Sequence, residues 1–280
     1  MPVDDVDTRP APARSLTRRE RLRRRTVDEI VERALDLVDG GGAHGLSIAQ
    51  VSKAMGMTPP ALYHYFPSRD ALLDALVLAA YTDLGAAVEA AAEAASDRPA
   101  PDRVAVIAHA WRRWAVDYPR RYVMLFTGSR REAVDPLADV GPIRHSMLAL
   151  VTALQELVPD GGGGASRDDA GRVDSSADEA AAPARGAATT GGGTSRGAAP
   201  ADENEAIVEP GLDADLLRWG QSLGAPPETA PDALRLALST WYRVHGLVSL
   251  ELVGGFGTMG LDGAALLTAE IESLVRESAR

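Results

Sequence analysis

The chain has 280 residues, an apolar content of 45% and a formal net charge of −11. Its length can bury a sizeable core in one large domain or two ordinary ones. The absence of cysteine excludes a disulfide framework, a thiolate zinc site and a cysteine nucleophile, and it fits a reducing compartment. The acidic balance argues against a nucleic-acid partner only if the charge is evenly spread along the chain.

The first 25 residues divide into an acidic tail and a basic arm. Residues 1–13 contain proline and aspartate without periodicity and are predicted to be disordered. Residues 14–25 contain seven arginines and one glutamate, a net +6 from seven minus one. No apolar signal region follows and no apolar run is long enough to span a bilayer, so we expect a cytoplasmic protein without a membrane partner.

A first helix is predicted from Val27 to Val38, where apolar residues recur three and four positions apart on one face. Glycines 40–42 end it, because glycine after the last periodic residue is typical of a helix C-terminus. We therefore place the boundary between the tail and basic arm (residues 1–25) and the first domain at residue 26.

A helix-turn-helix is predicted next. Ser47 and Gln50 have the spacing of a capping box at the start of a short helix. Gly56 interrupts that helix, and Thr58 followed by Pro59 opens a second one, since proline at the first helical position needs no donor. Two short helices joined in this way can place the second one in a major groove of DNA.

The remaining elements are also predicted to be helical, and no alternating strand pattern of useful length occurs. The helices are expected over residues 59–66, 68–95, 104–116, 122–126, 136–157, 212–223, 231–253 and 262–278. Residues 159–206 are rich in Gly, Ala, Ser and Asp, with too few apolar residues to offset the entropy of ordering, and are predicted to be a disordered insertion. The fold class is therefore all-α.

The run SIAQVSKAMGMTPPALYHYFPSRDALLDAL, which starts at Ser47, closely resembles the DNA-binding signature of the TetR/AcrR family. A weaker resemblance joins Trp241, His245 and Gly246 to the Trp-His-Gly class of C-terminal domains in that family. The resemblance implies a homodimer on a near-palindromic double-stranded DNA operator, with a small-molecule effector that changes the spacing of the recognition helices. It divides the chain into a helix-turn-helix DNA-binding domain (26–70) and a helical effector-binding and dimerisation domain (71–158 and 207–280).

The family pattern and residue chemistry together predict a set of DNA contacts. The helix start at Thr58 offers donors to a phosphate, Tyr63 offers apolar surface to a base or sugar, and Arg69 is expected to clamp a phosphate. The alternative for the aromatic residues is simple packing against the core. The full set is Arg24, Arg25, Ser47, Thr58, Pro59, Pro60, Tyr63, His64, Tyr65 and Arg69. Consecutive prolines depart from the usual family pattern, so base preference is not carried over.

Helix 231–253 is apolar around its whole axis, which predicts burial on all sides. We expect a second protomer to cover its outer face in a four-helix interface with helix 262–278; the alternative is a central helix within one protomer. The effector candidates are Trp111, Trp114, Tyr122, Phe126, His145, Trp241 and His245. For Trp241 and His245 the alternative is a satisfied core histidine beneath an indole.

No motif points to a cofactor, a metal or catalysis. Residues 255–260 match GxGxxG, but they follow a helix and not a strand, so they are not expected to bind a dinucleotide. The five histidines lack metal-ligand spacing. We therefore predict a non-enzymatic repressor released by a small, hydrophobic effector. The alternatives are an activator of the same fold, or an enzyme with an appended DNA-binding module.

Overall fold

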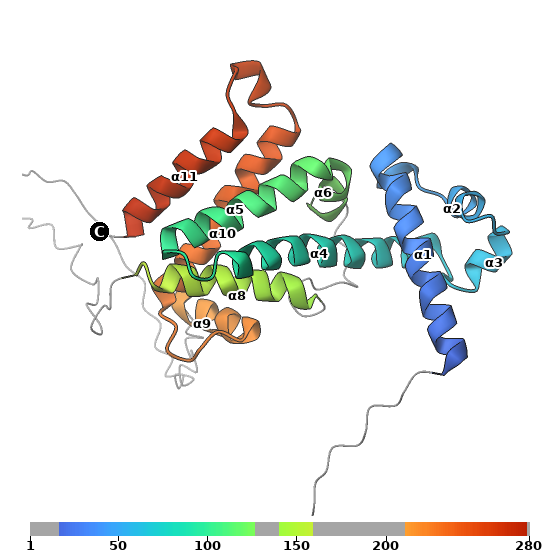
Figure 1. The fold of residues 1–280 in the computed structure, drawn as a ribbon, viewed down its shortest axis with the longest axis horizontal. Helices are drawn as coiled ribbons and strands as arrows, with labels where there is room; N and C mark the ends of the chain where they lie inside the picture. Colours follow the sequence, from blue (N-terminus) through green and yellow to red (C-terminus); the bar gives the residue numbers. More distant parts are fainter. Residues whose placement is uncertain (1–16, 127–139, 159–210, 279–280) are drawn as a thin grey trace, which may run out of the picture. The chain divides into compact units, whose positions relative to one another are not determined.

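The computed structural model describes residues 17–126, 140–158 and 211–278, and helix is the regular secondary structure throughout these ranges (Figure 1). The predicted all-α fold is confirmed. The α-helices are α1 (Arg18–Gly41), α2 (Ile48–Ala54), α3 (Pro59–Tyr63), α4 (Arg69–Ala94), α5 (Ala100–Asp117), α6 (Pro119–Phe126), α8 (Gly141–Gln155), α9 (Leu212–Leu223), α10 (Pro231–Leu252) and α11 (Gly263–Ser278). The predicted acidic tail and the 159–206 insertion lie outside the described residues.

Helix α1 begins earlier than the sequence indicated, so most of the basic arm is helical. Thr17 caps it: its hydroxyl accepts from the backbone N–H of Glu20, and the Glu20 carboxylate accepts from the Thr17 backbone N–H at 2.7 Å. The apolar period starts only at Val27 because the arginine turn faces solvent, and periodicity therefore could not detect it. Gly42, at φ 78°, terminates the helix as the glycine run predicts.

Helices α2 and α3 form the predicted helix-turn-helix. Both hydrogen bonds of the Ser47–Gln50 capping box are present, and Gly56 in the turn has a φ of 65°, which favours glycine. Helix α3 ends at Tyr63, and the chain then continues as a turn that brings Phe66 back onto the core. Leu62 and Phe66 are buried against α1, α2 and the start of α4.

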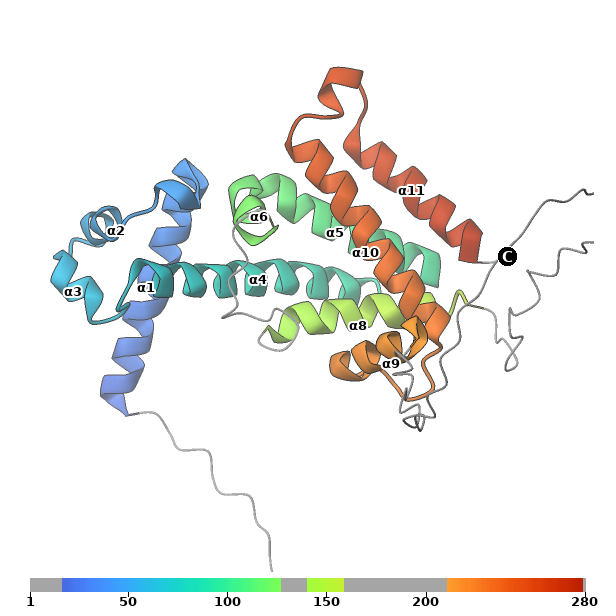
Figure 2. The same ribbon diagram turned by 180° about the vertical axis from the view of Figure 1, so that it is seen from behind.

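Helices α1, α2 and α3 with the start of α4 form the N-terminal unit, and the other described helices form the larger helical domain. Helix α4 runs from the N-terminal unit into the larger domain, where it packs against α5 and α8 (Figures 1 and 2). By length and composition α4 passes for a membrane span, but 44% of the apolar window is buried within the protein, as in a central core helix. Gly85 allows α8 its close approach: a Cβ there would lie 2.4 Å from the backbone nitrogen of Ile143.

Helices α10 and α11 lie side by side on the far side of α5, and α9 packs against α8 and α10 (Figure 2). The composition of α10 predicted burial on all sides. Within one chain, however, α10 is buried on only part of its surface. Leu234 and Val248 are buried, but Tyr242 and Leu250 are each 54% exposed. One apolar face of α10 therefore has no covering element among the described residues, and its cover by a second protomer stays a prediction.

Candidate nucleic-acid interface and aromatic cavity

The outer face of α3 is exposed in the manner expected of a recognition helix. Tyr63 is 50% exposed, and Thr58, Pro59, Pro60 and His64 are also exposed. The two apolar residues that pack this helix onto the core, Leu62 and Phe66, leave the opposite face free. Tyr63 and His64 are therefore placed where they can contact a partner, and they are not buried in the core as the packing alternative would require.

Tyr65 has a different environment from its neighbours. It is half-buried, and the guanidinium of Arg23 in α1 lies 5.2 Å from its ring centre. The same guanidinium donates a hydrogen bond of 3.1 Å to the carbonyl oxygen of His64. Arg23 thereby fixes the C-terminal end of α3 against α1. The sequence placed Arg23 only in a general basic arm, and no local signal identified this partner.

Other arginines of the arm lie exposed along the first turns of α1. Arg24 and Arg25 are exposed, as are Arg18 and Arg19. These guanidinium groups are carried by the helix that Arg23 joins to α3. An array of this kind suits a polyanion, since each neutralised phosphate releases counterions.

Two residues of the predicted DNA-contact set also have structural roles. Arg69 donates from Nε to the carbonyl oxygen of Leu46 at 2.7 Å and from one Nη to those of Ala43 and His44 at 3.0 and 3.2 Å. These bonds join the loop before α2 to α4, so Arg69 has a role inside the domain, and its contact with a phosphate stays a prediction. The Ser47 hydroxyl is likewise engaged by Gln50 in the helix cap.

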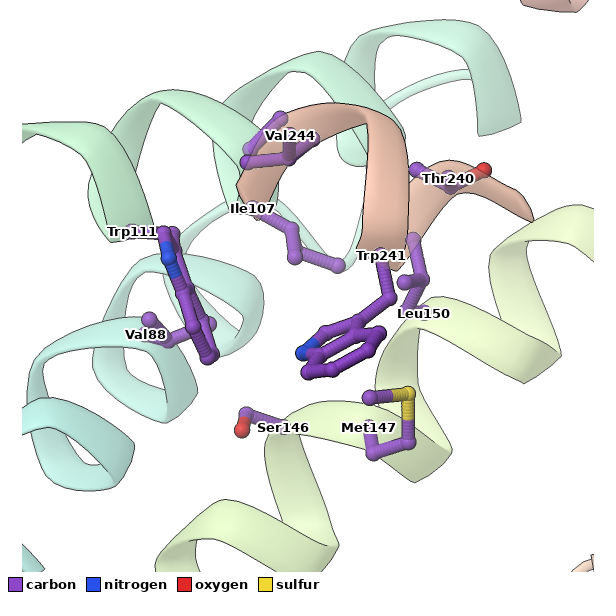
Figure 3. Close-up of a pocket in the computed structure, with 10 residues that line it drawn as sticks. Val88, Ile107, Trp111, Ser146, Met147, Leu150, Thr240, Trp241 and Val244 are labelled. Carbon is purple, nitrogen blue, oxygen red and sulfur yellow. The ribbon is translucent and has the colours of Figure 1, made fainter. Parts of the chain in front are cut away.

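A cavity lies in the larger domain between α4, α5, α8 and α10, with two tryptophans as its largest lining residues (Figure 3). The indoles of Trp111 and Trp241 stand on opposite sides of the space. The lining residues are Val88, Ile107, Ala108, Trp111, Ser146, Met147, Leu150, Thr240, Trp241 and Val244. The lining thus contains two hydroxyl groups and two indoles among apolar side chains, and none of its members is an acid or a base.

An aromatic cluster surrounds His245 next to this cavity. The hydroxyl of Tyr122 lies 2.7 Å from His245 Nδ1 and 3.3 Å from Ser249 Oγ. The His245 ring stacks on Trp241 with ring centres 5.4 Å apart, and the edge of Phe126 meets it at 4.6 Å. Burial raises the pKa of Tyr122, against the opposing effects of Ser249 and Trp111, and burial lowers the pKa of His245. Both groups therefore favour their neutral forms.

Five of the seven predicted effector residues come together here: Trp111, Tyr122, Phe126, Trp241 and His245. Trp114 and His145 do not. Trp114 is buried elsewhere, where its indole N–H donates to Asp83 at 2.9 Å. His145 lies on the surface, with Nδ1 2.9 Å from a carboxylate oxygen of Glu89. The sequence could not distinguish Trp114 and His145 from the five residues at the cavity, because both sets consist of aromatic and imidazole side chains on helices.

Helix α6 connects the cavity cluster with the N-terminal unit. Arg121, next to Tyr122 in the sequence, contacts Asp39 in α1 at 2.7 Å and Asp83 in α4 at 3.3 Å. Burial opposes the charge of Arg121, but the two carboxylates outweigh it, and its pKa is raised. Sequence reasoning missed this junction because Asp39 and Asp83 resemble the solvated charges of any helix surface.

Two family models match the chain: "Bacterial regulatory proteins, tetR family" over residues 26–76, and "Tetracyclin repressor-like, C-terminal domain" over residues 104–274. The HTH-type transcriptional regulator Rv1816 of Mycobacterium tuberculosis is 40% identical over 85 residues, 30% of this chain and 36% of that protein. The regulator YobS of Bacillus subtilis is 29% identical over 97 residues, 35% of this chain and 49% of that protein. The matches therefore span less than half the length of these curated relatives.

Solved structures resemble almost the whole chain. The putative regulatory protein SCO4313 superposes with a TM-score of 0.60 at 29% identity, covering 92% of this chain and 98% of that one. A protein of unknown function from Rhodococcus sp. RHA1 superposes with a TM-score of 0.55 at 21% identity, covering 97% and 99%. The second likeness is one of fold alone.

Replacing Arg69 by alanine is expected to destabilise the N-terminal unit by about 1–3 kcal/mol, because three backbone carbonyls lose a charged donor. Urea unfolding followed by circular dichroism measures this. Arg24→Ala is the matched control, since this exposed side chain should change stability by less than about 0.5 kcal/mol. Equal stabilities of the two variants would contradict the structural role of Arg69.

Proposed function

The chain belongs to the TetR family of DNA-binding transcriptional regulators, and we propose that it is a repressor released from its operator by a small apolar effector. The observation that supports this proposal is that the two features it needs lie in different parts of the chain. An exposed aromatic recognition helix lies in the N-terminal unit, and a cavity with an uncharged lining lies in the larger domain. In this proposal the effector binds in the cavity, and α3 binds the operator.

The DNA-facing surface combines a helix for the groove with charges for the backbone. Tyr63 and His64 project from α3, and its N-terminal turn presents Thr58 and two prolines. We propose that these residues contact bases and sugars, while the exposed arginines of α1 contact phosphates. Affinity supported by phosphate contacts falls as salt rises, so the arginines are expected to give operator binding a steep salt dependence.

A second copy of the chain is the proposed occupant of the uncovered face of α10. Leu238, Tyr242, Gly246 and Leu250 recur every four residues and so form one stripe on this face. All four are exposed, and a Cβ at Gly246 would have no neighbour within 4 Å. A glycine in the middle of an apolar stripe permits the close approach of an identical helix across a two-fold axis. Dimerisation also fits the family.

We propose that α6 transmits the signal from the cavity to the DNA-binding unit. Consecutive residues of this short helix face two ways: Tyr122 contacts His245, and Arg121 contacts Asp39 at the end of α1. An effector that displaces the aromatic cluster would therefore shift α6 and, with it, the attachment of α1. The mechanism is a population shift between a dimer whose recognition helices match the operator and one whose helices do not.

We also propose a class for the C-terminal domain, a cellular compartment and the sign of regulation. We assign the C-terminal domain to the Trp-His-Gly class, in which Trp241 and His245 would act as one stacked unit beside the effector. The working compartment is proposed to be the cytoplasm, where operator DNA is accessible to a bacterial regulator. Repression is preferred to activation because release by an effector needs no further contact with the transcription machinery.

Tyr63→Ala is expected to lower operator affinity by about 10- to 100-fold, because it removes an exposed groove contact without disturbing Leu62 beneath it. Fluorescence anisotropy with operator DNA selected from a random pool measures the loss. Tyr63→Phe serves as the control that separates the ring from the hydroxyl. Unchanged affinity of the alanine variant would remove Tyr63 from the interface.

A reporter placed behind the operator tests the sign of regulation. In a strain that lacks the gene, the reporter should be derepressed, and the wild-type chain but not Tyr63→Ala should restore repression. A reporter that falls in the deletion strain would instead indicate the activator of the same fold.

Leu250→Glu is expected to shift the dimer to monomer, because a charge would be buried at the proposed two-fold interface. Leu212→Glu is a matched control: Leu212 is 55% exposed and Leu250 54%, but Leu212 lies in α9, away from the stripe. Analytical ultracentrifugation distinguishes the two. A Leu250→Glu protein that remains as dimeric as the control would contradict the α10 interface.

The α6 junction predicts non-additive stabilities. In a double-mutant cycle, Asp39→Asn and Arg121→Gln should be coupled by about 1–3 kcal/mol, because either change breaks the same partly buried pair. The exposed pair Arg33–Asp36 is the control, with an expected coupling of at most about 0.5 kcal/mol. Equal couplings for both pairs, measured by urea unfolding, would show that α6 is not firmly joined to α1.

A further inference from the structure

We propose that Arg23 of α1 is a positioning residue for operator recognition. It holds the C-terminal end of α3 in the orientation in which Tyr63 and His64 meet the base pairs, and it does not itself neutralise a phosphate. This inference rests on the operator-binding function proposed above and sets Arg23 apart from the other arginines of the basic arm. Three observations lead to it: the side of α1 on which Arg23 lies, the contacts of its guanidinium group, and the dependence of α3 on its neighbours.

Arg23 lies on the core-facing side of α1. An α-helix turns by about 100° per residue, so residues four and seven positions apart share one side. Val27 and Ile30 follow Arg23 at these two spacings, and Ile30 is buried in the core. Arg24 and Arg25, one and two positions further along, point to other sides of the helix. The register of α1 therefore places Arg23, and not Arg24 or Arg25, beside the helix-turn-helix.

The guanidinium group of Arg23 makes two contacts at the end of α3. Its central carbon lies 5.2 Å from the centre of the Tyr65 ring, and one Nη donates at 3.1 Å to the carbonyl oxygen of His64. A planar guanidinium can lie over a ring and still donate to an acceptor in its own plane, whereas the ammonium of a lysine has no flat face and is more strongly hydrated. The hydrogen bond joins residues 41 positions apart and so links α1 directly to the recognition helix.

The orientation of α3 depends on tertiary contacts. The helix has five residues, and a helix of this length is not stable without packing. Leu62 and Phe66 hold its buried side against the core. The last carbonyl groups of a helix have no donor within the helix, and that of His64 takes its donor from Arg23. Because Tyr63 and His64 lie at this end, a rotation of the helix end would move both side chains relative to the base pairs.

A residue that positions α3 affects DNA binding differently from one that neutralises a phosphate. Base contacts distinguish the operator from other sequences, whereas phosphate contacts strengthen binding to every sequence and set its salt dependence. Loss of the Arg23 contacts should therefore weaken binding to the operator and leave binding to random DNA nearly unchanged. Loss of Arg24, which we assign to a phosphate, should weaken binding to both.

Two substitutions in the full-length protein separate these effects. Affinities for the selected operator and for a random duplex of the same length are measured by fluorescence anisotropy over a range of salt concentrations. Arg23→Lys keeps the charge but loses the planar group, so we expect it to lower the ratio of operator to random-DNA affinity by about 3- to 10-fold. Its slope of log affinity against log salt should equal that of the wild type. Arg24→Gln should weaken binding to both DNAs, keep the ratio, and reduce the slope by about 1.

Arg33→Lys is the matched control, because Arg33 is an exposed arginine of the same helix that pairs with Asp36 outside the basic arm. This variant should change neither the ratio nor the slope. Tyr65→Leu should lower the ratio as Arg23→Lys does, and the double variant should lose little more, since the two side chains act through one contact. Urea unfolding of each variant verifies that the compared proteins are folded.

A wild-type ratio in the Arg23→Lys protein would overturn the inference, as would losses in Arg23→Lys and Tyr65→Leu that add fully in the double variant. A reduced slope in Arg23→Gln, equal to that in Arg24→Gln, would also overturn it, because Arg23 would then be one more phosphate contact. These results leave operator binding by the wild-type chain standing. Failure of the wild-type chain to select any sequence from a random pool would contradict the proposed function and the inference with it.

Discussion

The contact between Arg121 and Asp39 joins the DNA-binding unit to the rest of the protein. Its partly buried guanidinium is shared between a carboxylate at the end of α1 and another in the middle of α4. Asp83 also accepts from the indole of Trp114, so α1, α4, α5 and α6 meet at a few polar atoms. A junction of directional bonds holds its partners in defined positions, and a small rotation of α6 would strain it. The proposed signal path depends on this stiffness.

The aromatic cluster gives the same helix its second attachment. Tyr122 bonds to His245 while Arg121 bonds to α1, and the two side chains are neighbours in the sequence. Burial favours the neutral forms of Tyr122 and His245, by raising the pKa of the first and lowering that of the second, and the Tyr122 hydroxyl lies 2.7 Å from His245 Nδ1. Trp111, which lines the cavity, lies next to this cluster, with its ring centre 5.8 Å from that of Phe126.

Two exposed surfaces of the described chain are the proposed binding sites for macromolecular partners. The exposed face of α3 and the arginines of α1 are polar or aromatic groups suited to DNA, while the stripe on α10 is apolar and suited to an identical helix. The two surfaces lie on different elements, so each can bind its partner without excluding the other. A dimer would present two recognition helices at a spacing set by the larger domain, and a change in that domain then alters operator fit.

The sequence by itself determined the local features: the all-α fold, the capped helix start at Ser47, the turn at Gly56 and the exposed recognition helix. These depend on neighbours within a few positions, where capping and periodicity act. It also identified most of the aromatic residues around the cavity, though by chemistry and not by position, and its further candidates Trp114 and His145 lie outside the cavity lining. Only the tertiary structure decided that Arg69 binds backbone carbonyls, that Arg23 supports α3, and that Arg121 joins α6 to α1. Each of these contacts links residues more than twenty positions apart, and a guanidinium can reach many acceptors, so its partner is set by how the helices pack.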